Sequence, residues 1–261
     1  MRVPAIFVAH GAPTLALEED GYTRALAAYG ARLESPAAIL VCSAHWQAPP
    51  PIRLTGAPRP GLIHDFAGFP DALYRVRYDC PGAPDLAREA AGLLGAAGIE
   101  ARLDPERGLD HGAWVPLRFL RPAADVPVVQ VSLPAGAGPD DLQRAGAALA
   151  PLRERGVPIL GTGGIVHNLR RVRMDDKEAP VEPWALEFDA WVAERIARSD
   201  VAALRDYRTR APHAALAAPT SEHFDPVFVV LGAALPGDRT QSLYAGFHHG
   251  SLSMRSFALA P

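Results

Sequence analysis

Short, strongly apolar runs alternate along the chain with longer segments in which apolar residues recur at helical spacing. Such runs are typical of strands buried on both faces of a parallel sheet, and helical spacing indicates amphipathic helices that cover those faces. The main apolar runs predict strands at residues 4–9, 37–45, 126–133 and 156–160. The helical pattern predicts helices at residues 20–33, 84–97, 140–154, 182–198, 201–208 and 223–231. We therefore predict an α/β fold in which a central, mostly parallel sheet is flanked by helices on both faces.

Weaker signals predict the remaining elements. Alternating positions indicate a short edge strand at residues 52–55 and further strands at residues 74–78, 98–103, 241–247 and 251–259. Residues 56–70 are rich in Gly and Pro and predict a long loop, a feature that is commonly functional in compact domains. Residues 108–114 are also predicted as a loop. No linker or repeat divides the sequence, so we expect residues 1–261 to form a single domain.

Composition removes several classes of function. The 261 residues are 49% hydrophobic and carry a net charge of −3, with both signs mixed and no basic tract. A nucleic-acid-binding protein needs a clustered basic face, so we expect no nucleic-acid partner. The first apolar stretch is too short for a signal peptide or a membrane span, and two cysteines without a Cys-x-x-Cys motif do not form a disulfide framework. These features predict a cytoplasmic protein without a membrane partner.

Three of the nine histidines stand at or just beyond the ends of predicted strands. They are His10, His45 and His167, and each is accompanied by small residues that leave room for a ligand. In an open α/β sheet, binding and catalytic groups collect beyond the carboxyl ends of the strands. One such histidine is more often an ordinary surface residue, but three of them favour a shared metal site.

His223, at the start of the predicted helix 223–231, is the best candidate to complete this site. The neighbouring Glu222 is an alternative ligand, and a third interpretation makes His223 only a neighbour of the helix cap. Neutral imidazoles suit zinc, iron, copper and nickel, and three protein ligands with an open position are typical of a catalytic centre.

Two further stretches carry candidate chemistry. His111 follows Asp110 and precedes an indole, and such an imidazole is placed for proton transfer or for a hydrogen bond to substrate. The alternative is a solvated loop histidine paired with Asp110. Residues 64–66, His-Asp-Phe, either line the mouth of the site or only order their loop.

Other motifs are discounted. The glycines of residues 161–164 lack both the ending of a P-loop and the spacing of a dinucleotide site, so we interpret them as backbone room beside His167. A Gly-x-Ser-x-Gly elbow is absent, which disfavours a serine hydrolase. The other polar or terminal histidines, His213, His248 and His249, are interpreted as structural.

Five motifs together resemble the class III extradiol ring-cleaving dioxygenases, and within them the 4,5-DOPA extradiol dioxygenase type. They lie between residue 10 and about residue 225, in the order expected for that family, and are highly specific as a set. The motifs are His10-Gly-x-Pro13, Ser43-Ala-His45-Trp46, His64-Asp65-Phe-x-Gly68-Phe69-Pro70, Gly108-Leu-Asp-His111-Gly-x-Trp114 and His167-Asn168-Leu169.

The resemblance implies a non-haem Fe(II) enzyme that opens a catechol ring next to its hydroxyls with O2, and whose bacterial members often hold zinc. Carried over by position, His10, His45 and His223 are metal ligands, and His167 is an acid/base that can also approach the metal. His111 matches a histidine that assists proton transfer. We further expect apolar walls for the substrate ring from Trp46, Phe66, Phe69 and Trp114, with His64 at the mouth of the site. The alternative, for at least two of these four aromatic residues, is an ordinary place in the core.

The ligand set also admits other functions. An all-histidine set differs from the two-histidine, one-carboxylate set usual for oxygen-activating Fe(II), and Glu222 as a ligand would restore it. A zinc hydrolase that uses the same histidines and a non-catalytic metal-binding scaffold are the alternatives. The expected partners are O2 and a small diphenol, DOPA-like or otherwise, and the expected assembly is a monomer or a small homo-oligomer.

Overall fold

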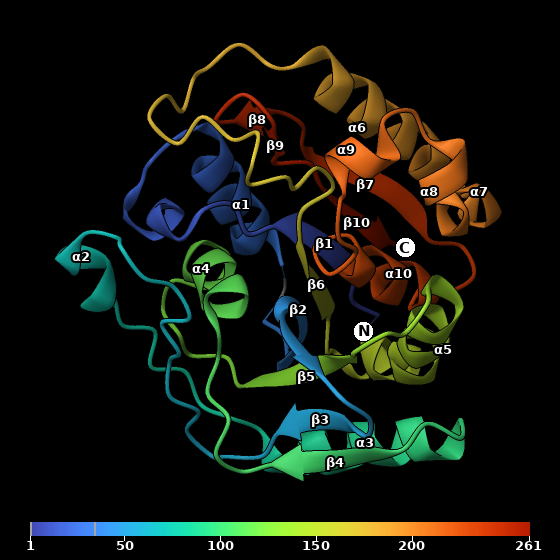
Figure 1. Cartoon of the computed structure of the whole chain (residues 1–261). Helices are drawn as coiled ribbons and strands as arrows, with labels where there is room; N and C mark the ends of the chain where they lie inside the picture. The colour runs from blue at the N-terminus through green and yellow to red at the C-terminus, as the bar shows by residue number, and fades with distance from the viewer. Residues whose placement is uncertain (1, 34) are drawn as a thin grey trace.

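The computed structural model describes residues 2–33 and 35–261, and within them an eight-stranded sheet runs in the order β4-β3-β5-β2-β6-β1-β10-β7 (Figure 1). Two short strands, β8 and β9, form a separate pair. The strands are β1 (Ala5–Ala9), β2 (Ile39–Ala48), β3 (Ile52–Thr55), β4 (Ala101–Asp104), β5 (Val128–Pro134), β6 (Ile159–Gly163), β7 (Arg239–Tyr244), β8 (Phe247–His248), β9 (Leu252–Ser253) and β10 (Ser256–Ala260).

Helices connect most of these strands. They are α1 (Gly21–Arg32), α2 (Asp71–Tyr74), α3 (Pro84–Ala96), α4 (His111–Leu120), α5 (Pro139–Leu149), α6 (Pro183–Ala197), α7 (Val201–Arg205), α8 (Tyr207–Arg210), α9 (Ala214–Ala217) and α10 (Asp225–Gly232). Two 3-10 helices, η1 (Pro13–Leu17) and η2 (Ala150–Arg155), complete the set in the described chain. None of these helices is both long and apolar enough to cross a membrane, as far as the described residues go.

The centre of the sheet is parallel. Strands β5, β2, β6 and β1 pair in parallel, whereas β10 and β7 on one side, and β3 against β5 on the other, pair antiparallel. All five residues of β1 are buried, as expected for a strand that is covered on both faces. The predicted α/β fold with a mostly parallel sheet is therefore confirmed, with antiparallel strands added at its flanks.

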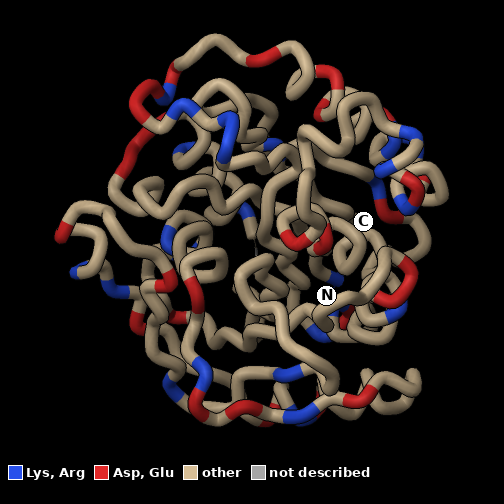
Figure 2. The backbone as a smooth tube through the Cα atoms, in the orientation of Figure 1, with Lys and Arg blue, Asp and Glu red and all other residues tan. Residues whose placement is uncertain are grey.

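Helices cover both faces of the sheet and define two hydrophobic cores. Along β1, Ala5 and Phe7 pack into one core and Ile6 and Val8 into the other, because successive strand residues point to opposite faces. The first core contains buried residues of α3, α5, α6 and α10, and the second contains those of α1 and α4. In the view of Figure 2, charged residues of both signs are interspersed around the rim of the molecule.

Three predictions about individual elements need correction. Residues 74–78 do not form a strand; α2 ends at Tyr74, and the residues that follow it belong to no helix or strand. Their alternation is real, because Val76, Tyr78 and Cys80 are buried while the residues between them are exposed. The predicted edge strand at 52–55 is β3, which lies between β4 and β5, so β4 is the edge.

The third correction concerns residues 108–114, which were predicted as a loop. The first turn of α4 begins inside this stretch, at His111. Asp110 caps the helix by accepting a hydrogen bond from the Ala113 amide. Gly112 and Pro116, which resemble loop residues in the sequence, are both buried in this helix. His111 is therefore held on a capped helix rather than on a loop.

Candidate metal centre

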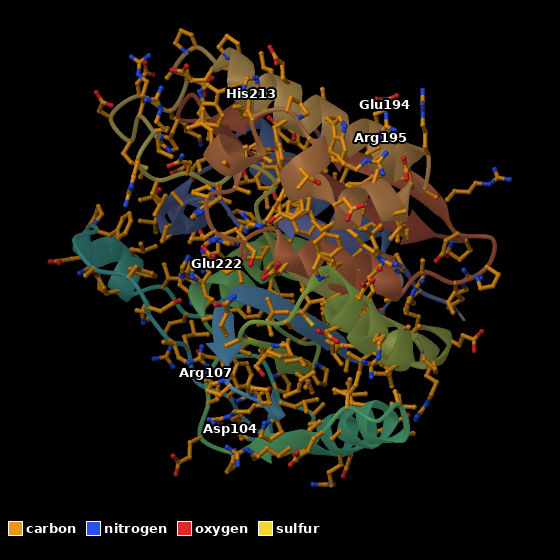
Figure 3. All side chains as sticks on the ribbon, turned by 45° about the vertical axis from the view of Figure 1, so that its right-hand side comes forward. Asp104, Arg107, Glu194, Arg195, His213 and Glu222 are labelled. Atoms are coloured by element: carbon orange, nitrogen blue, oxygen red, sulfur yellow. The ribbon has the colours of Figure 1, made fainter. Side chains whose placement is uncertain are left out.

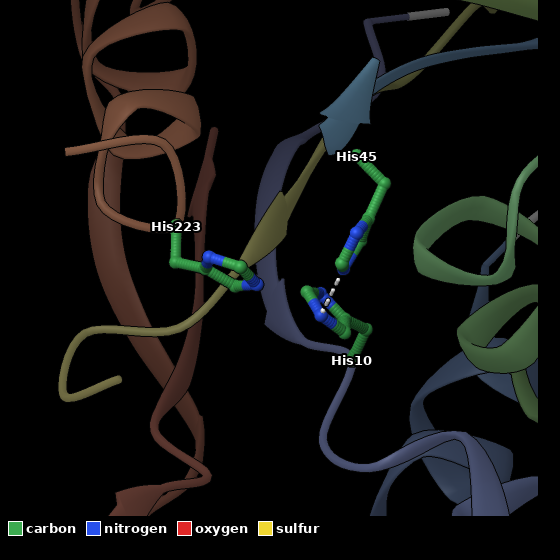
Figure 4. Close-up of side chains that lie close together, drawn as sticks. All are labelled: His10, His45 and His223. Atoms are coloured by element: carbon green, nitrogen blue, oxygen red, sulfur yellow. Dashed lines mark hydrogen bonds between the residues drawn. The ribbon is translucent and has the colours of Figure 1, made fainter. Parts of the chain in front are cut away.

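Three histidine side chains converge beyond the carboxyl ends of the central strands (Figure 4). His10 directly follows β1, His45 lies near the end of β2, and His223 lies in the turn that leads into α10. Ring nitrogens of the three lie within 4.8 Å of one another. The Nε2 atoms of His10 and His45 are 2.9 Å apart. The fold thus brings together residues from both ends of the chain.

Two ring nitrogens of this group lack hydrogen-bond partners in the described part of the chain. Among residues 2–33 and 35–261, Nδ1 of His10 and Nε2 of His223 are buried without a hydrogen-bond partner. An unpaired buried polar group costs roughly 1–3 kcal/mol, a cost that an ion bound to Nε2 of His223 would remove at that atom. Metal–imidazole bonds of about 2.0 Å place two nitrogens on one tetrahedral ion about 3.3 Å apart, so small side-chain shifts would accommodate it.

Burial keeps these imidazoles neutral. It lowers the pKa of His223, and burial together with the His45 ring lowers the pKa of His10 well below its usual value. Burial and the neighbouring His111 and His223 rings lower the pKa of His45 to about 2. Because metal binding requires the unprotonated nitrogen of a neutral imidazole, the group fits a divalent transition-metal ion.

Glu222, the alternative ligand, is labelled in Figure 3. It directly precedes His223 in the turn that leads into α10. Its Oε1 accepts hydrogen bonds from Nδ1 of His223 at 3.1 Å and from the Thr220 hydroxyl at 2.7 Å. The hydrogen bond from His223 lowers the pKa of Glu222 to about 2. Metal-binding histidines commonly donate their second nitrogen to a carboxylate. The geometry therefore favours His223 as the ligand and Glu222 as its partner.

His167 lies beside this group on the segment that follows β6. Its ring stacks on that of His223 with centroids 3.4 Å apart. His167, Glu222 and His223 also have ligand atoms within 4.8 Å of one another. Burial and the His223 ring lower the pKa of His167 to about 3. The structure thus places His167 next to His223.

His111 faces the same space from α4. Its ring centroid is 4.0 Å from that of His45 and 5.3 Å from that of His10. Its carboxylate partner is Asp65, whose Oδ1 lies 2.9 Å from Nδ1 of His111. The expected alternative pairing of His111 with Asp110 is wrong, because Asp110 is buried and caps α4 instead.

An aromatic cluster adjoins His111. The ring centroid of Phe66 lies 5.6 Å from that of His111. The ring centroid of His64 lies 5.7 Å from those of Phe66 and Trp114. Trp114 is fully buried and donates to the Ile63 carbonyl, so it supports the loop from behind. Phe69 lies 5.5 Å from Phe66.

Two aromatic residues lie elsewhere than the sequence suggests. Tyr74 joins the cluster, with its ring centroid 5.3 Å from that of Phe66. The sequence does not indicate this role, because the alternation of residues 74–78 predicts a strand. The one sequence signal for Tyr74 is that residues 64–74 carry three aromatic residues close together. Trp46, expected in the same wall, instead lies under the guanidinium of Arg107, 5.0 Å from its ring centroid.

Glycines allow the close approach of the elements that carry the site. A Cβ on Gly163, at the end of β6, would lie 2.1 Å from the carbonyl oxygen of His223. A Cβ on Gly112 would lie 2.3 Å from Oγ of Ser43, where α4 packs on β2. The glycines after residue 160 thus make room for the His223 turn, and not only for His167 as predicted.

Residues 3–253 match the family described as the catalytic LigB subunit of aromatic ring-opening dioxygenase. The chain belongs to this LigB family. It is therefore an aromatic ring-opening extradiol dioxygenase, and the resemblance inferred from the five motifs is confirmed.

Named relatives agree with this assignment. The LigB-family chain is 38% identical over 258 residues to "4,5-DOPA dioxygenase extradiol" of Escherichia coli K12, covering 98% of this chain and 94% of the relative. It is 35% identical over 255 residues to the protein of the same name from Beta vulgaris, covering 96% of this chain and 94% of the relative. The crystal structure of an uncharacterized Escherichia coli K12 protein superposes with a TM-score of 0.84 at 33% identity, over 99% of this chain and 100% of the other.

Proposed function

We propose that this LigB-family enzyme opens the ring of a catechol next to its hydroxyl groups with O2, using Fe(II) held by His10, His45 and His223. The observation that carries the proposal is the convergence of three neutral imidazoles, with buried nitrogens that lack protein partners. Three protein ligands leave positions open for the substrate. Family membership favours ring opening over the zinc hydrolase and the metal-binding scaffold.

Bound iron would supply the redox chemistry with O2 that zinc, held by the same nitrogens, does not have. The protein's own part is to bind and orient the diphenol and to move its protons. His167 is the proposed base for a catechol hydroxyl, because burial keeps its ring neutral beside His223. A histidine that has taken this proton can return it as an acid later in the reaction.

His111 is the second proposed proton-transfer residue. Its Nδ1 faces the Asp65 carboxylate, so a neutral ring has the proton on Nδ1 and an acceptor at Nε2. Phe66, which lies beside His111, and His64, which lies beside Phe66, are proposed to contact the aromatic ring of the substrate. Trp114 supports this wall from behind, and Trp46 is proposed to act only at its periphery.

A pocket next to the site suits a substrate that carries an acidic group. It is lined by His167 and Glu222 on the side of the histidine group and also by Arg170 and Arg171, with a cavity volume of about 540 Å³. Within the described chain neither guanidinium forms an ion pair, and both side chains are exposed. Because guanidinium groups bind carboxylates well, we propose a carboxylate-bearing catechol of the DOPA type as the preferred substrate.

Oxygen uptake tests the proposal. The metal-free protein is loaded anaerobically with Fe(II), mixed with a catechol, and exposed to air while oxygen and the yellow ring-opened product are followed. Turnover is expected with iron and not with zinc, and it should be lost in His45→Ala. Fully iron-loaded protein that consumes no oxygen across a catechol panel would contradict the proposal.

A further inference from the structure

Asp65 is the carboxylate that faces two of the site histidines at once. Its Oδ1 lies 2.9 Å from Nδ1 of His111 and accepts a second hydrogen bond, at 3.0 Å, from the His111 backbone amide. Its Oδ2 lies 3.7 Å from Nδ1 of His45. Within residues 2–33 and 35–261, Asp65 pairs with no lysine or arginine, so its charge is directed at these two rings.

These contacts specify where the ring protons lie. An ionised carboxylate only accepts hydrogen bonds, so the 2.9 Å contact requires a proton on Nδ1 of His111. The 3.7 Å contact is longer than a hydrogen bond, and there the negative charge acts on His45 by favouring the same Nδ1-protonated form. Each neutral ring then has an unprotonated Nε2, and that of His45 faces His10.

We propose that Asp65 is a positioning residue that holds His45 and His111 in their Nδ1-protonated tautomers, so that Nε2 of His45 is free for a metal and Nε2 of His111 for proton transfer. The inference rests on the proposed function for the roles of these two nitrogens. Both roles then depend on one carboxylate of the 56–70 loop. The loop must therefore be folded against His45 and His111 before either ring is held in its Nδ1-protonated tautomer.

A different use of the same residues predicts the opposite tautomers. His45, Asp65 and His111 also have ligand atoms within 4.8 Å of one another, a two-histidine, one-carboxylate donor set. An ion bound between Asp65 and the two Nδ1 atoms would require both of these nitrogens to be unprotonated. The tautomers of His45 and His111 therefore distinguish an Asp65 that positions the two rings from an Asp65 that binds a metal itself.

Nitrogen NMR of wild-type protein labelled with 15N-histidine reads the tautomers directly. The metal-free and zinc-loaded forms are compared, and the two resonances are assigned from His45→Gln and His111→Gln spectra. Nδ1-protonated rings are expected at both positions in both forms, with Nε2 of His45 shifted on zinc binding. Nε2 protonation of either ring, or loss of the Nδ1 proton of His45 on zinc binding, would overturn the proposal even if no Asp65 variant folds.

Metal affinity provides the second test. Chelator competition measures Zn(II) or Co(II) dissociation constants for wild type, Asp65→Asn, Asp65→Glu and the control Asp71→Asn, which alters an exposed aspartate on α2. Loss of a partner to a metal-binding histidine typically costs 10–100-fold in affinity, so a loss of about that size is expected for Asp65→Asn, with partial recovery in Asp65→Glu. The control should match wild type, and the Co(II) absorption spectrum should change only in the Asp65 variants.

Wild-type affinity and an unchanged Co(II) spectrum in Asp65→Asn would overturn the positioning role. These readouts need no turnover. If iron-loaded wild type fails to open catechols while Asp65→Asn still weakens metal binding, the proposed function fails and the inference about Asp65 stands on its tautomer and affinity data.

Discussion

At the scale of single residues, the hydrogen-bond partners of the ring nitrogens indicate the role of each histidine better than its position in the sequence does. The sequence pointed to His10, His45 and His223 because each stands at the boundary of a strand or helix. It could not choose between His223 and Glu222, because the choice depends on the hydrogen bond between the two side chains. The partner of His111 was also out of reach, since Asp65 meets it only when the 56–70 loop folds back onto α4.

Substitution of single histidines should separate metal binding from proton transfer. His10→Ala and His45→Ala each remove a proposed ligand, so elemental analysis should find a metal content near that of the chelated protein. His111→Ala should retain metal and lose roughly 10²–10⁴-fold in kcat, the usual contribution of a positioned acid or base. Full metal occupancy in His45→Ala would refute its assignment as a ligand.

The arginines beside His167 should act on substrate choice. Replacing Arg170 and Arg171 by Gln removes the proposed partners of a substrate carboxylate, so KM for a carboxylate-bearing catechol should rise about tenfold, equivalent to about 1.4 kcal/mol. KM for 4-methylcatechol should not change, and oxygen uptake measures both. An equal effect on both substrates would count against recognition of the acidic group.

At the scale of secondary-structure elements, the strands that end at the site were predictable and the start of α4 was not. Apolar runs mark β1 and β2 because these strands are buried on both faces. The first turn of α4 carries Gly112, whose missing side chain reflects close packing on Ser43 rather than a loop. Residues 74–78 alternate because alternate side chains of this irregular segment pack into the core, although the segment forms no strand.

Close packing of β6 against the His223 turn gives a direct test at this scale. In Gly163→Ala the new Cβ would meet the His223 carbonyl oxygen at 2.1 Å, so the turn must move. Overpacking of this kind typically costs 1–3 kcal/mol, and we expect about that loss in urea unfolding together with weaker metal binding. Gly95→Ala, on α3 with nothing within 4 Å of its Cβ, is the matched control and should be neutral or stabilising. Unchanged metal affinity in Gly163→Ala would contradict the role assigned to this contact.

At the scale of the whole molecule, the alternation of strands and helices predicted the parallel centre of the sheet. The strand order was not predictable, because it depends on pairing between distant segments, such as β1 with both β6 and β10. That pairing matters for the site, since it places His10 beside the segments that carry His45 and His223. The burial of several imidazoles at one place also affects the stability of the entire fold.

The metal-free protein should lose stability as the pH falls below about 6.5. Burial lowers the folded-state pKa of His45 to about 2 and that of His167 to about 3, so these rings stay neutral while the unfolded chain takes up protons near pH 6.5. Their contribution is present in full above that pH and decreases below it, by about 2 kcal/mol for each ring between pH 7.5 and pH 5. Urea unfolding measures the change.

A single substitution checks that the site histidines cause this dependence. His45→Gln should flatten the fall in stability with acidification, because it removes a ring whose folded-state pKa is lowered by burial. If the free energy of unfolding falls equally with acidification in His45→Gln and in wild type, the pH dependence arises from other groups.

The central claim is that one divalent ion binds where His10, His45 and His223 meet. Anomalous diffraction at the iron edge, from crystals loaded anaerobically with Fe(II), tests it most directly. The account predicts a single strong peak within bonding distance of one nitrogen of each of these three residues. A peak between Asp65 and His111 instead, or no peak beside His10, would contradict it.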